Sequence, residues 1–188
     1  TGLLGGGGFY LYANAFLNTE IVRVLLLFYL MPIWATILGR LFLGESVTTV
    51  RILAIALGLG GLLVMLGIDH GWPLPKNAGD WMALAAGMMW AYTCVRYRQA
   101  PAVGTIEQTF GFTMGCIVWG LVFLLIPTEG PGIIIAFSTL DNIVWIVLGV
   151  TASIVISTNF LIIWGARQLS PGLVGLLNLM ELLAGAAT

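Results

Sequence analysis

Long apolar runs separated by short polar breaks dominate this chain. The uncharged stretches cover residues 1–19, 24–39, 52–68, 81–95, 108–128 and 142–166. A helix that crosses a lipid bilayer needs about 20 mostly apolar residues, so these runs have the length of membrane spans. Apolar and polar positions do not alternate within the runs, which favours helices over the strands of a membrane barrel.

Turn-forming residues divide the chain into seven expected helices. Examples are Gly44–Glu45–Ser46 and Ser170–Pro171, which both interrupt the apolar pattern. The expected helices cover residues 2–19, 22–43, 48–68, 79–98, 104–127, 141–166 and 170–188. The stretch 128–140 is the least defined, because prolines and glycines break the pattern there. The sequence therefore predicts an all-α, polytopic bundle of transmembrane helices.

Composition supports this prediction and narrows the class of protein. The chain is 60% hydrophobic and only 8% charged, against about 25% charged residues in a typical soluble domain. A soluble fold would therefore expose large apolar patches, whereas lipid is a compatible partner for the outer surface. The net charge of −1 gives no basis for binding nucleic acid. The pattern does not define an oligomeric state.

Motifs of catalysis and cofactor binding are missing from the sequence. There is no glycine-rich phosphate loop, no zinc-protease motif and no serine-hydrolase elbow. The chain has one histidine, His70, and its two cysteines fall inside apolar runs, so no metal-binding spacing exists. We therefore expect no catalytic residue, no metal and no cofactor, and we expect that the protein is not an enzyme.

Basic residues predict the orientation of the helices in the membrane. Five of the seven lie in connections on one side of the predicted bundle, namely Arg40, Arg51, Arg96, Arg98 and Arg167. Arg23 and Lys76 lie on the opposite side. Because cytoplasmic connections are enriched in lysine and arginine, the first group is expected to face the cytoplasm.

Pro32 lies near the middle of the expected helix 22–43 and should kink it. A kink at this place has two interpretations. It is a common structural feature of membrane helices, and broken helices also line the cavities of transporters.

Several segments resemble EamA-type proteins of the drug/metabolite transporter (DMT) superfamily. The stretch Leu27–Trp34 with its central proline, closed by Leu43–Gly44–Glu45, is similar to the fourth helix of that family. Further similar segments are the glycine-bearing helix with Gly58, Gly60 and Gly61, the opening Gly79–Leu84 with Trp90–Ala91 and Arg96, and Ser170–Pro171 through Met180–Glu181. The order and spacing of these segments carry the resemblance across nearly the whole chain.

The resemblance implies two inverted repeats of five helices, of which this chain holds helices three to nine. Residues 1–68 would be the last three helices of the first repeat, and residues 79–188 the first four of the second. Residues 69–78 would be an extracytoplasmic linker, and both repeats would be truncated. The implied topology places residues 40–51 in the cytoplasm, in agreement with the arginine count.

Glu181 is the most distinctive candidate for a functional residue. Eleven residues beyond Ser170, it should lie roughly 16 Å into a core of about 30 Å, where a carboxylate costs roughly 2.5 kcal/mol or more. It should therefore face protein or a water-filled cavity. Asn178, three residues earlier on the same face, could join it in binding a substrate ammonium group or relaying a proton. The alternative is a structural hydrogen bond between helices.

Four further residues are candidates for substrate contact. Tyr10 and Asn14 share one face of the first expected helix, and Asn159 is a polar residue within the sixth. Trp90 could line an aromatic pocket for amphipathic or cationic substrates. The competing interpretation for all four is a structural role in helix packing, because buried amides require partners in any case.

Glu45 closes the second expected helix on the arginine-bearing side. With Arg40 and Arg51 nearby, it could form an ion pair that fixes the connecting loop or acts as an inner gate.

Together these features predict a multi-pass transporter of the bacterial inner membrane. The expected function is export of small, amino-acid-like metabolites or drugs by alternating access, with the proton as a candidate coupling ion. The expected partners are the lipid bilayer and a small-molecule substrate. The alternatives are a non-transporting membrane scaffold or receptor, and a membrane-embedded lipid enzyme.

Overall fold

The computed structural model describes residues 1–66, 74–125 and 141–186, with the side chains of α9 described as far as Met180. Its helices are α1 (Gly2–Asn18), α2 (Ile21–Phe28), α3 (Met31–Leu43), α4 (Thr49–Leu66), α5 (Ala78–Gln99), α6 (Thr105–Leu124), α8 (Asn142–Gln168) and α9 (Pro171–Ala186). Helices make up nearly all of the described residues, and no strand occurs among them. The prediction of an all-α bundle is confirmed.

Each of the seven expected helices has a counterpart, and the boundaries agree within a few residues. The expected helix 22–43 is represented by α2 and α3 together. The uncertain stretch 128–140 and residues 69–73 of the expected linker 69–78 lie outside the described residues.

The break between α2 and α3 follows from Pro32. This residue lies in the first turn of α3, and Tyr29 and Leu30 form a turn between α2 and α3. Proline has no amide hydrogen, and its ring clashes with the carbonyl four residues earlier, which here belongs to Phe28. The expected kink is therefore present as a two-residue interruption just ahead of the proline. The Phe28 carbonyl lies against α5, where a Cβ atom at Gly87 would come within 2.7 Å of it.

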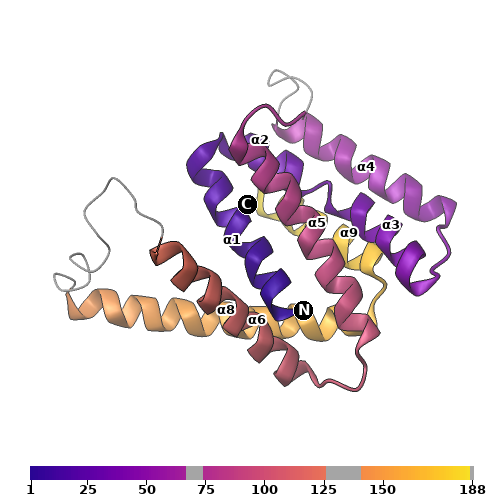
Figure 1. The fold of residues 1–188 in the computed structure, drawn as a ribbon. Helices are drawn as coiled ribbons and strands as arrows, with labels where there is room; N and C mark the ends of the chain where they lie inside the picture. Colours follow the sequence, from indigo (N-terminus) through magenta and orange to yellow (C-terminus); the bar gives the residue numbers. More distant parts are fainter. Residues whose placement is uncertain (67–73, 126–140, 187–188) are drawn as a thin grey trace.

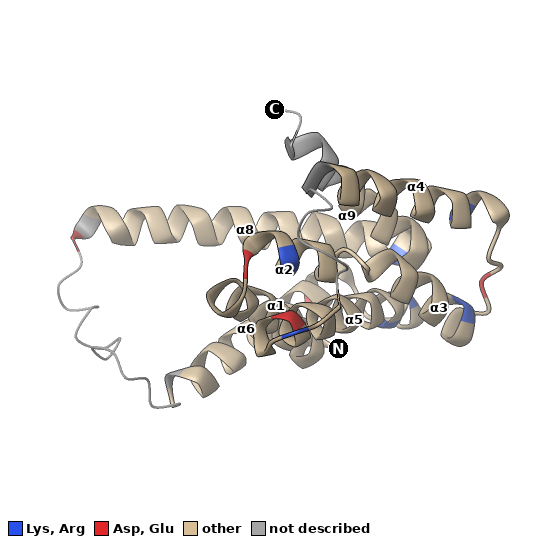
Figure 2. Cartoon of the chain, turned by 90° about the horizontal axis from the view of Figure 1, so that it is seen from above, with Lys and Arg blue, Asp and Glu red and all other residues tan. Residues whose placement is uncertain are grey.

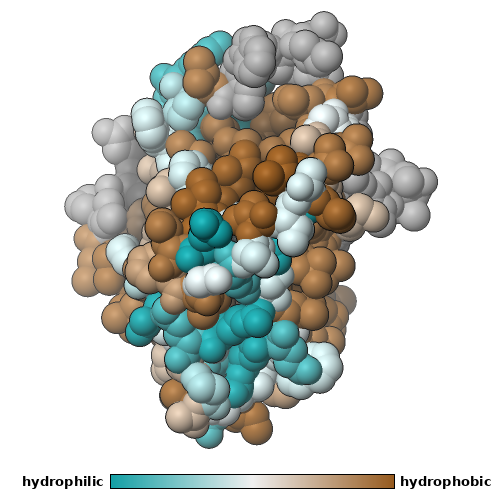
Figure 3. All heavy atoms as spheres, turned by 90° about the vertical axis from the view of Figure 1, so that its right-hand side faces the viewer, coloured by the Kyte–Doolittle hydropathy of each residue, from teal (hydrophilic) through white to brown (hydrophobic). Residues whose placement is uncertain are grey.

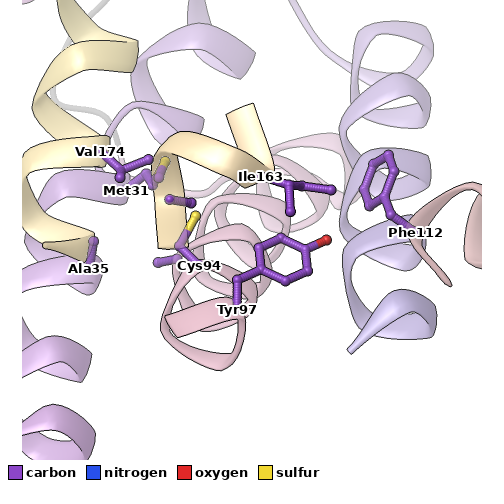
Figure 4. Packing of buried hydrophobic residues seen from close by; sticks show 9 residues of the cluster. Met31, Ala35, Cys94, Tyr97, Phe112, Ile163 and Val174 are labelled. Atoms are coloured by element: carbon purple, nitrogen blue, oxygen red, sulfur yellow. The ribbon is translucent and has the colours of Figure 1, made fainter. Parts of the chain in front are cut away.

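Helix α5 forms the centre of the bundle and contacts α1, α2, α3, α8 and α9 (Figure 1). Small side chains at its buried positions allow these helices to approach closely. The largest buried cluster brings together Met31, Ala35, Ala91, Cys94, Tyr97, Phe112, Ile163, Ala166 and Val174 (Figure 4). Because these residues come from both halves of the chain, the core joins the two expected repeats.

Glycines bring the backbones of α1 and α6 into contact. A Cβ atom at Gly6 would overlap the backbone at Gly115, and one at Gly115 would overlap the backbone at Gly2. The indole nitrogen of Trp119 donates to the carbonyl oxygen of Leu3 at 2.9 Å across the same interface. Small residues thus let these two helices pack closely, as is common in membrane bundles.

Three described helical segments are long and apolar enough to cross a membrane: Ile21–Leu43, Thr105–Phe123 and Ile143–Gln168. The apolar segments Thr49–Val64 and Pro171–Met180 are shorter, and α1 has 17 residues. Helix α5 is long but less apolar, because its small buried residues face other helices rather than lipid. Hydrophobic side chains cover much of the face shown in Figure 3. These features are those of a helical membrane bundle.

Candidate functional site

A cavity of about 300 Å³ lies where both halves of the chain meet. We call it the central cavity. Its walls come from α1, from α2 and the turn that follows it, and from α5, α6, α8 and α9. The lining residues are Gly8, Phe9, Tyr12, Phe28, Tyr29, Trp90, Phe112, Asn159, Ile162 and Asn178. None of these is charged, so the described walls offer aromatic rings and neutral polar groups.

Two groups of contacting aromatic rings line the central cavity. The rings of Tyr12 and Phe28 have centroids 4.2 Å apart, and those of Trp90 and Phe112 meet edge to face at 5.8 Å. Tyr29 packs edge to face on Phe28 at 5.5 Å, so the broken helix contributes two rings. Such walls suit flat apolar groups and cations, because the ring faces carry partial negative charge.

Two asparagine side chains add hydrogen-bonding groups to this wall. The side-chain nitrogen of Asn159 donates to the carbonyl of Val155 at 2.9 Å, and that of Asn178 lies 3.6 Å from the sulfur of Met31. A primary amide has two donor hydrogens and an acceptor oxygen. The described contacts therefore leave both amides with capacity to bind a solute.

Of the residues proposed from sequence, the structure brings Trp90, Asn159 and Asn178 to one cavity. They come from α5, α8 and α9, which are separate in sequence. The sequence analysis missed most of the aromatic lining, including Phe28 and Phe112. The apolar runs contain many such aromatics, and only the packing shows which of them face the cavity.

Tyr10 and Asn14, which were also expected to contact substrate, do not line this cavity. The Tyr10 ring stacks on Phe123 of α6 with centroids 3.7 Å apart, and the Asn14 amide donates to the Tyr10 carbonyl at 3.0 Å. Tyr12 takes the cavity position instead. Two residues along a helix turn the side chain by about 200°, so Tyr10 faces away when Tyr12 faces in.

Five arginines mark one end of the bundle, which we call the arginine-rich end: Arg40, Arg51, Arg96, Arg98 and Arg167 (Figure 2). Glu45 lies among them. Arg51 donates to Glu45 Oε2 at 3.1 Å and to Ser170 Oγ at 2.8 Å, and Arg98 lies 3.3 Å from Glu45 Oε1. This network connects the turn after α3 with α4, α5 and α9.

The structure corrects the proposed role of Arg40. Its side chain is exposed and pairs with no described residue, whereas Arg98 of α5 is the second partner of Glu45. Gly44 explains the difference, because its φ of +67° reverses the chain at the end of α3. Glu45 then folds back toward Gly39, where a Cβ atom would lie 3.2 Å from its Oε2, and away from Arg40.

A second ion pair lies at the opposite end of α5, and the sequence analysis did not find it. Arg23 Nε donates to both carboxylate oxygens of Asp80, at 3.2 and 3.1 Å, and Arg23 Nη2 also contacts Asp80. Thr19 and the amide of Lys76 donate to the same carboxylate at 2.9 and 2.8 Å. We call this the Asp80 end. The sequence did contain a signal for this pair. Arg23 and Asp80 carry opposite charges, and each directly precedes an uncharged run on the same expected side of the membrane.

Comparison with known proteins supplies a family for part of the chain. Residues 1–67 match the model of the EamA-like transporter family. The matched segment covers less than half of the chain. The resemblance to that family seen in the sequence is confirmed, and the family is one of membrane transporters.

A structural comparison supports the fold beyond that segment. A solved structure described as "Crystal structure of protein" has a TM-score of 0.72 and 18% sequence identity, and it covers 95% of this chain. At this identity the likeness concerns the fold alone. The chain spans 62% of the length of that structure's chain. No curated protein matches it in sequence.

Glu181 stays a prediction. Its backbone belongs to α9, but its side chain lies outside the described residues. Asn178, one turn earlier, does line the central cavity.

Proposed function

We propose that the chain is the solute-binding part of an exporter of small metabolites or drugs in the bacterial inner membrane. The central cavity is the observation that carries this proposal, because helices from both expected repeats line it with aromatic rings and amides. Its volume of about 300 Å³ is at the lower end of the range of ligand sites. A cavity between inverted repeats is where transporters of this architecture bind their substrates.

The chemistry of the wall favours solutes that combine an apolar or aromatic group with a polar head. The rings of Trp90 and Phe112 would stack on the apolar group or hold a cation. The amides of Asn159 and Asn178 would bind the polar head through hydrogen bonds. Amino-acid-like metabolites and amphipathic drugs share this pattern.

Alternating access would move the solute past this cavity, with the two expected repeats rocking against each other. Proton coupling would use the Glu181 carboxylate, which we propose as the protonated group close to the solute. The interruption between α2 and α3 supports this mechanism, because the rings of Phe28 and Tyr29 lie at the interruption and line the same cavity.

Efflux measurements test the proposal. Cells that express the chain are loaded with candidate amino acids, cations and dyes, and the rate of loss is compared with that of cells expressing Trp90→Ala or Asn178→Ala. Removing a ring or an amide that contacts the solute should slow efflux about tenfold. Tyr10→Phe is the matched control, since its ring lies outside the cavity and should leave the rate unchanged.

Two further results bear on coupling and on the alternatives. A protonophore should abolish efflux against a gradient, and Glu181→Gln should impair transport while the protein still reaches the membrane. Unchanged transport by Glu181→Gln would remove that residue from the mechanism. A chain that changes the accumulation of none of the solutes would instead support the scaffold or receptor alternative.

A further inference from the structure

A second cavity, of about 320 Å³, lies at the arginine-rich end and shares no lining residue with the central cavity. It is bounded by the end of α5, the start of α6 and the end of α8. Its lining residues are Tyr97, Arg98, Pro101, Thr105, Trp164, Arg167 and Gln168. We call it the arginine pocket. It has no part in the proposed transport path.

The arginine pocket carries positive charge that the described residues do not fully balance. Arg98 and Arg167 line it, and no acidic residue does. Glu45 lies 3.3 Å from Arg98 and offsets one of the two charges. Arg167 bonds only to neutral oxygens, those of Thr105 Oγ1 at 3.0 Å and the Pro101 carbonyl at 3.1 Å. A guanidinium has five donor hydrogens, so Arg167 keeps three for another acceptor.

An unpartnered hydroxyl adds a second and independent observation. Tyr97 is 1% exposed, and its hydroxyl has no hydrogen-bond partner in the described structure. Figure 4 shows its ring reaching from α5 toward Ile163 and Phe112. Buried hydroxyls nearly always have a partner, so this one needs an acceptor. Tyr97 also lines the arginine pocket, so an anion bound there is the acceptor that we assign to this hydroxyl.

The surroundings of the pocket match a membrane boundary. Trp164 forms part of its wall and is 54% exposed, as expected for an indole at the level of lipid headgroups. Thr105 begins α6, so free amides and positive dipole lie at this wall. The ends of α5 and α8 add opposite partial charges of about half a charge each, which the start of α6 and the unpaired guanidinium of Arg167 outweigh.

We propose that the arginine pocket binds a phosphate-bearing anion, held by Arg98 and Arg167 and by the Tyr97 hydroxyl. Arginine matches the geometry of phosphate oxygens with paired donors, and basic pockets between membrane helices hold anionic lipid headgroups. The phosphate group comes from an anionic lipid or from free phosphate in solution. The inference does not depend on the solute proposed for the central cavity.

Ligand binding to the purified, delipidated chain tests this proposal and distinguishes the two sources. The probes are phosphatidylglycerol, phosphatidylcholine and inorganic phosphate, and the readouts are bound mass by native mass spectrometry and the shift in unfolding temperature. We expect phosphatidylglycerol to bind at least about tenfold more tightly than phosphatidylcholine, because an anionic headgroup makes stronger charge-assisted hydrogen bonds to arginine than a headgroup without net charge. Stabilisation by inorganic phosphate alone would assign the pocket to a free anion.

Two variants locate the binding in the pocket. Arg167→Gln should weaken the binding of the preferred probe about tenfold. Arg96→Gln should leave this binding unchanged, because Arg96 is exposed and, among the described residues, bonds only to Gln99. Arg167→Lys keeps the charge without the paired donors and replaces the first variant if that one does not fold.

Tyr97→Phe adds a prediction that a general attraction of charge would not make. This variant should weaken the binding of the preferred probe about tenfold. The ligand-free protein should be as stable as before or more stable, because the change removes a buried hydroxyl without a partner. Equal binding of the two lipids with no response to phosphate would overturn the proposal. So would an equal loss in Arg96→Gln and Arg167→Gln.

Discussion

The two ends of α5 are both tied to neighbouring helices by ion pairs, but in different ways. At the Asp80 end the carboxylate is fully buried and accepts from Arg23, Thr19 and the amide of Lys76. At the arginine-rich end Glu45 is shared by two arginines, and its Oε1 has no donor in hydrogen-bonding geometry. One end is saturated with hydrogen bonds, and the other is not.

This difference indicates where the bundle can open. A buried and saturated ion pair is costly to break, because each charge would be left without a partner in a medium of low dielectric. A shared carboxylate close to solvent exchanges partners at lower cost. We therefore expect the Asp80 end to hold α2 against α5, and the arginine-rich end to rearrange when α4 and α9 separate.

The largest effect is expected from Asp80→Asn. This change leaves the buried guanidinium of Arg23 without its counter-charge and should lower the free energy of unfolding by about 3–5 kcal/mol. Equilibrium unfolding in mixed micelles measures it. Lys76→Gln is the control, because the backbone amide of this residue, not its side chain, donates to Asp80. Equal effects of the two variants would contradict the account.

Glu45→Gln should have a smaller effect at the arginine-rich end. Its side chain is 13% exposed, so water compensates part of the loss and about 1–2 kcal/mol is expected in the same unfolding measurement. Arg40→Gln lies on the same turn but removes no pair, and it should be close to neutral. A loss as large as that of Asp80→Asn would remove the distinction between the two ends.

High salt should lower the contribution of the arginine-rich end to the free energy of unfolding by about 0.5–1 kcal/mol more than that of the Asp80 end. Raising the ionic strength to about 1 M shortens the screening length to about 3 Å and weakens charges near solvent more than buried ones. The wild-type chain and Asp80→Asn should both lose this amount of unfolding free energy in high salt. Glu45→Gln should not, because it no longer has the ion pair that salt weakens. Unfolding curves at two salt concentrations measure it, and an equal salt response of all three chains would argue against the comparison.

The smallest effect is expected from Thr36→Val. The Thr36 hydroxyl is buried near Arg51 and has no hydrogen-bond partner in the described structure, so its removal should be neutral or stabilising by about 0.5 kcal/mol. Thr93→Val is the matched control. Its buried hydroxyl donates to the Met89 carbonyl at 2.7 Å, so about 1 kcal/mol should be lost. The reverse order would show that Thr36 has a partner in solution.

The helices could be predicted from the sequence because a membrane span is a local property of composition. Runs of about 20 apolar residues and their breaks are sufficient to define helix boundaries. The break at Pro32 could be anticipated for the same reason, since proline acts on the carbonyl four residues earlier. Its exact form depended on the packing of Phe28 against Gly87.

The candidate sites were predictable only in part, because they depend on the direction of each side chain. Polar residues within apolar runs included two that line the central cavity, Asn159 and Asn178, and two that do not, Tyr10 and Asn14. The pairing of Arg23 with Asp80 joins residues 57 positions apart. Such pairings depend on which helices are neighbours, and local patterns do not contain that information.

Accessibility of a cysteine in the central cavity tests the central claim most directly. In a chain with both native cysteines replaced by alanine, Asn178→Cys is exposed to a membrane-impermeant maleimide from either side of sealed vesicles. Ser153→Cys on the exposed face of α8 is the control. The account predicts that position 178 reacts from the arginine-rich side, that Glu45→Gln speeds this reaction, and that a transported solute slows it. A cysteine at 178 that stays unreactive from both sides, or that no transported solute protects, would contradict it.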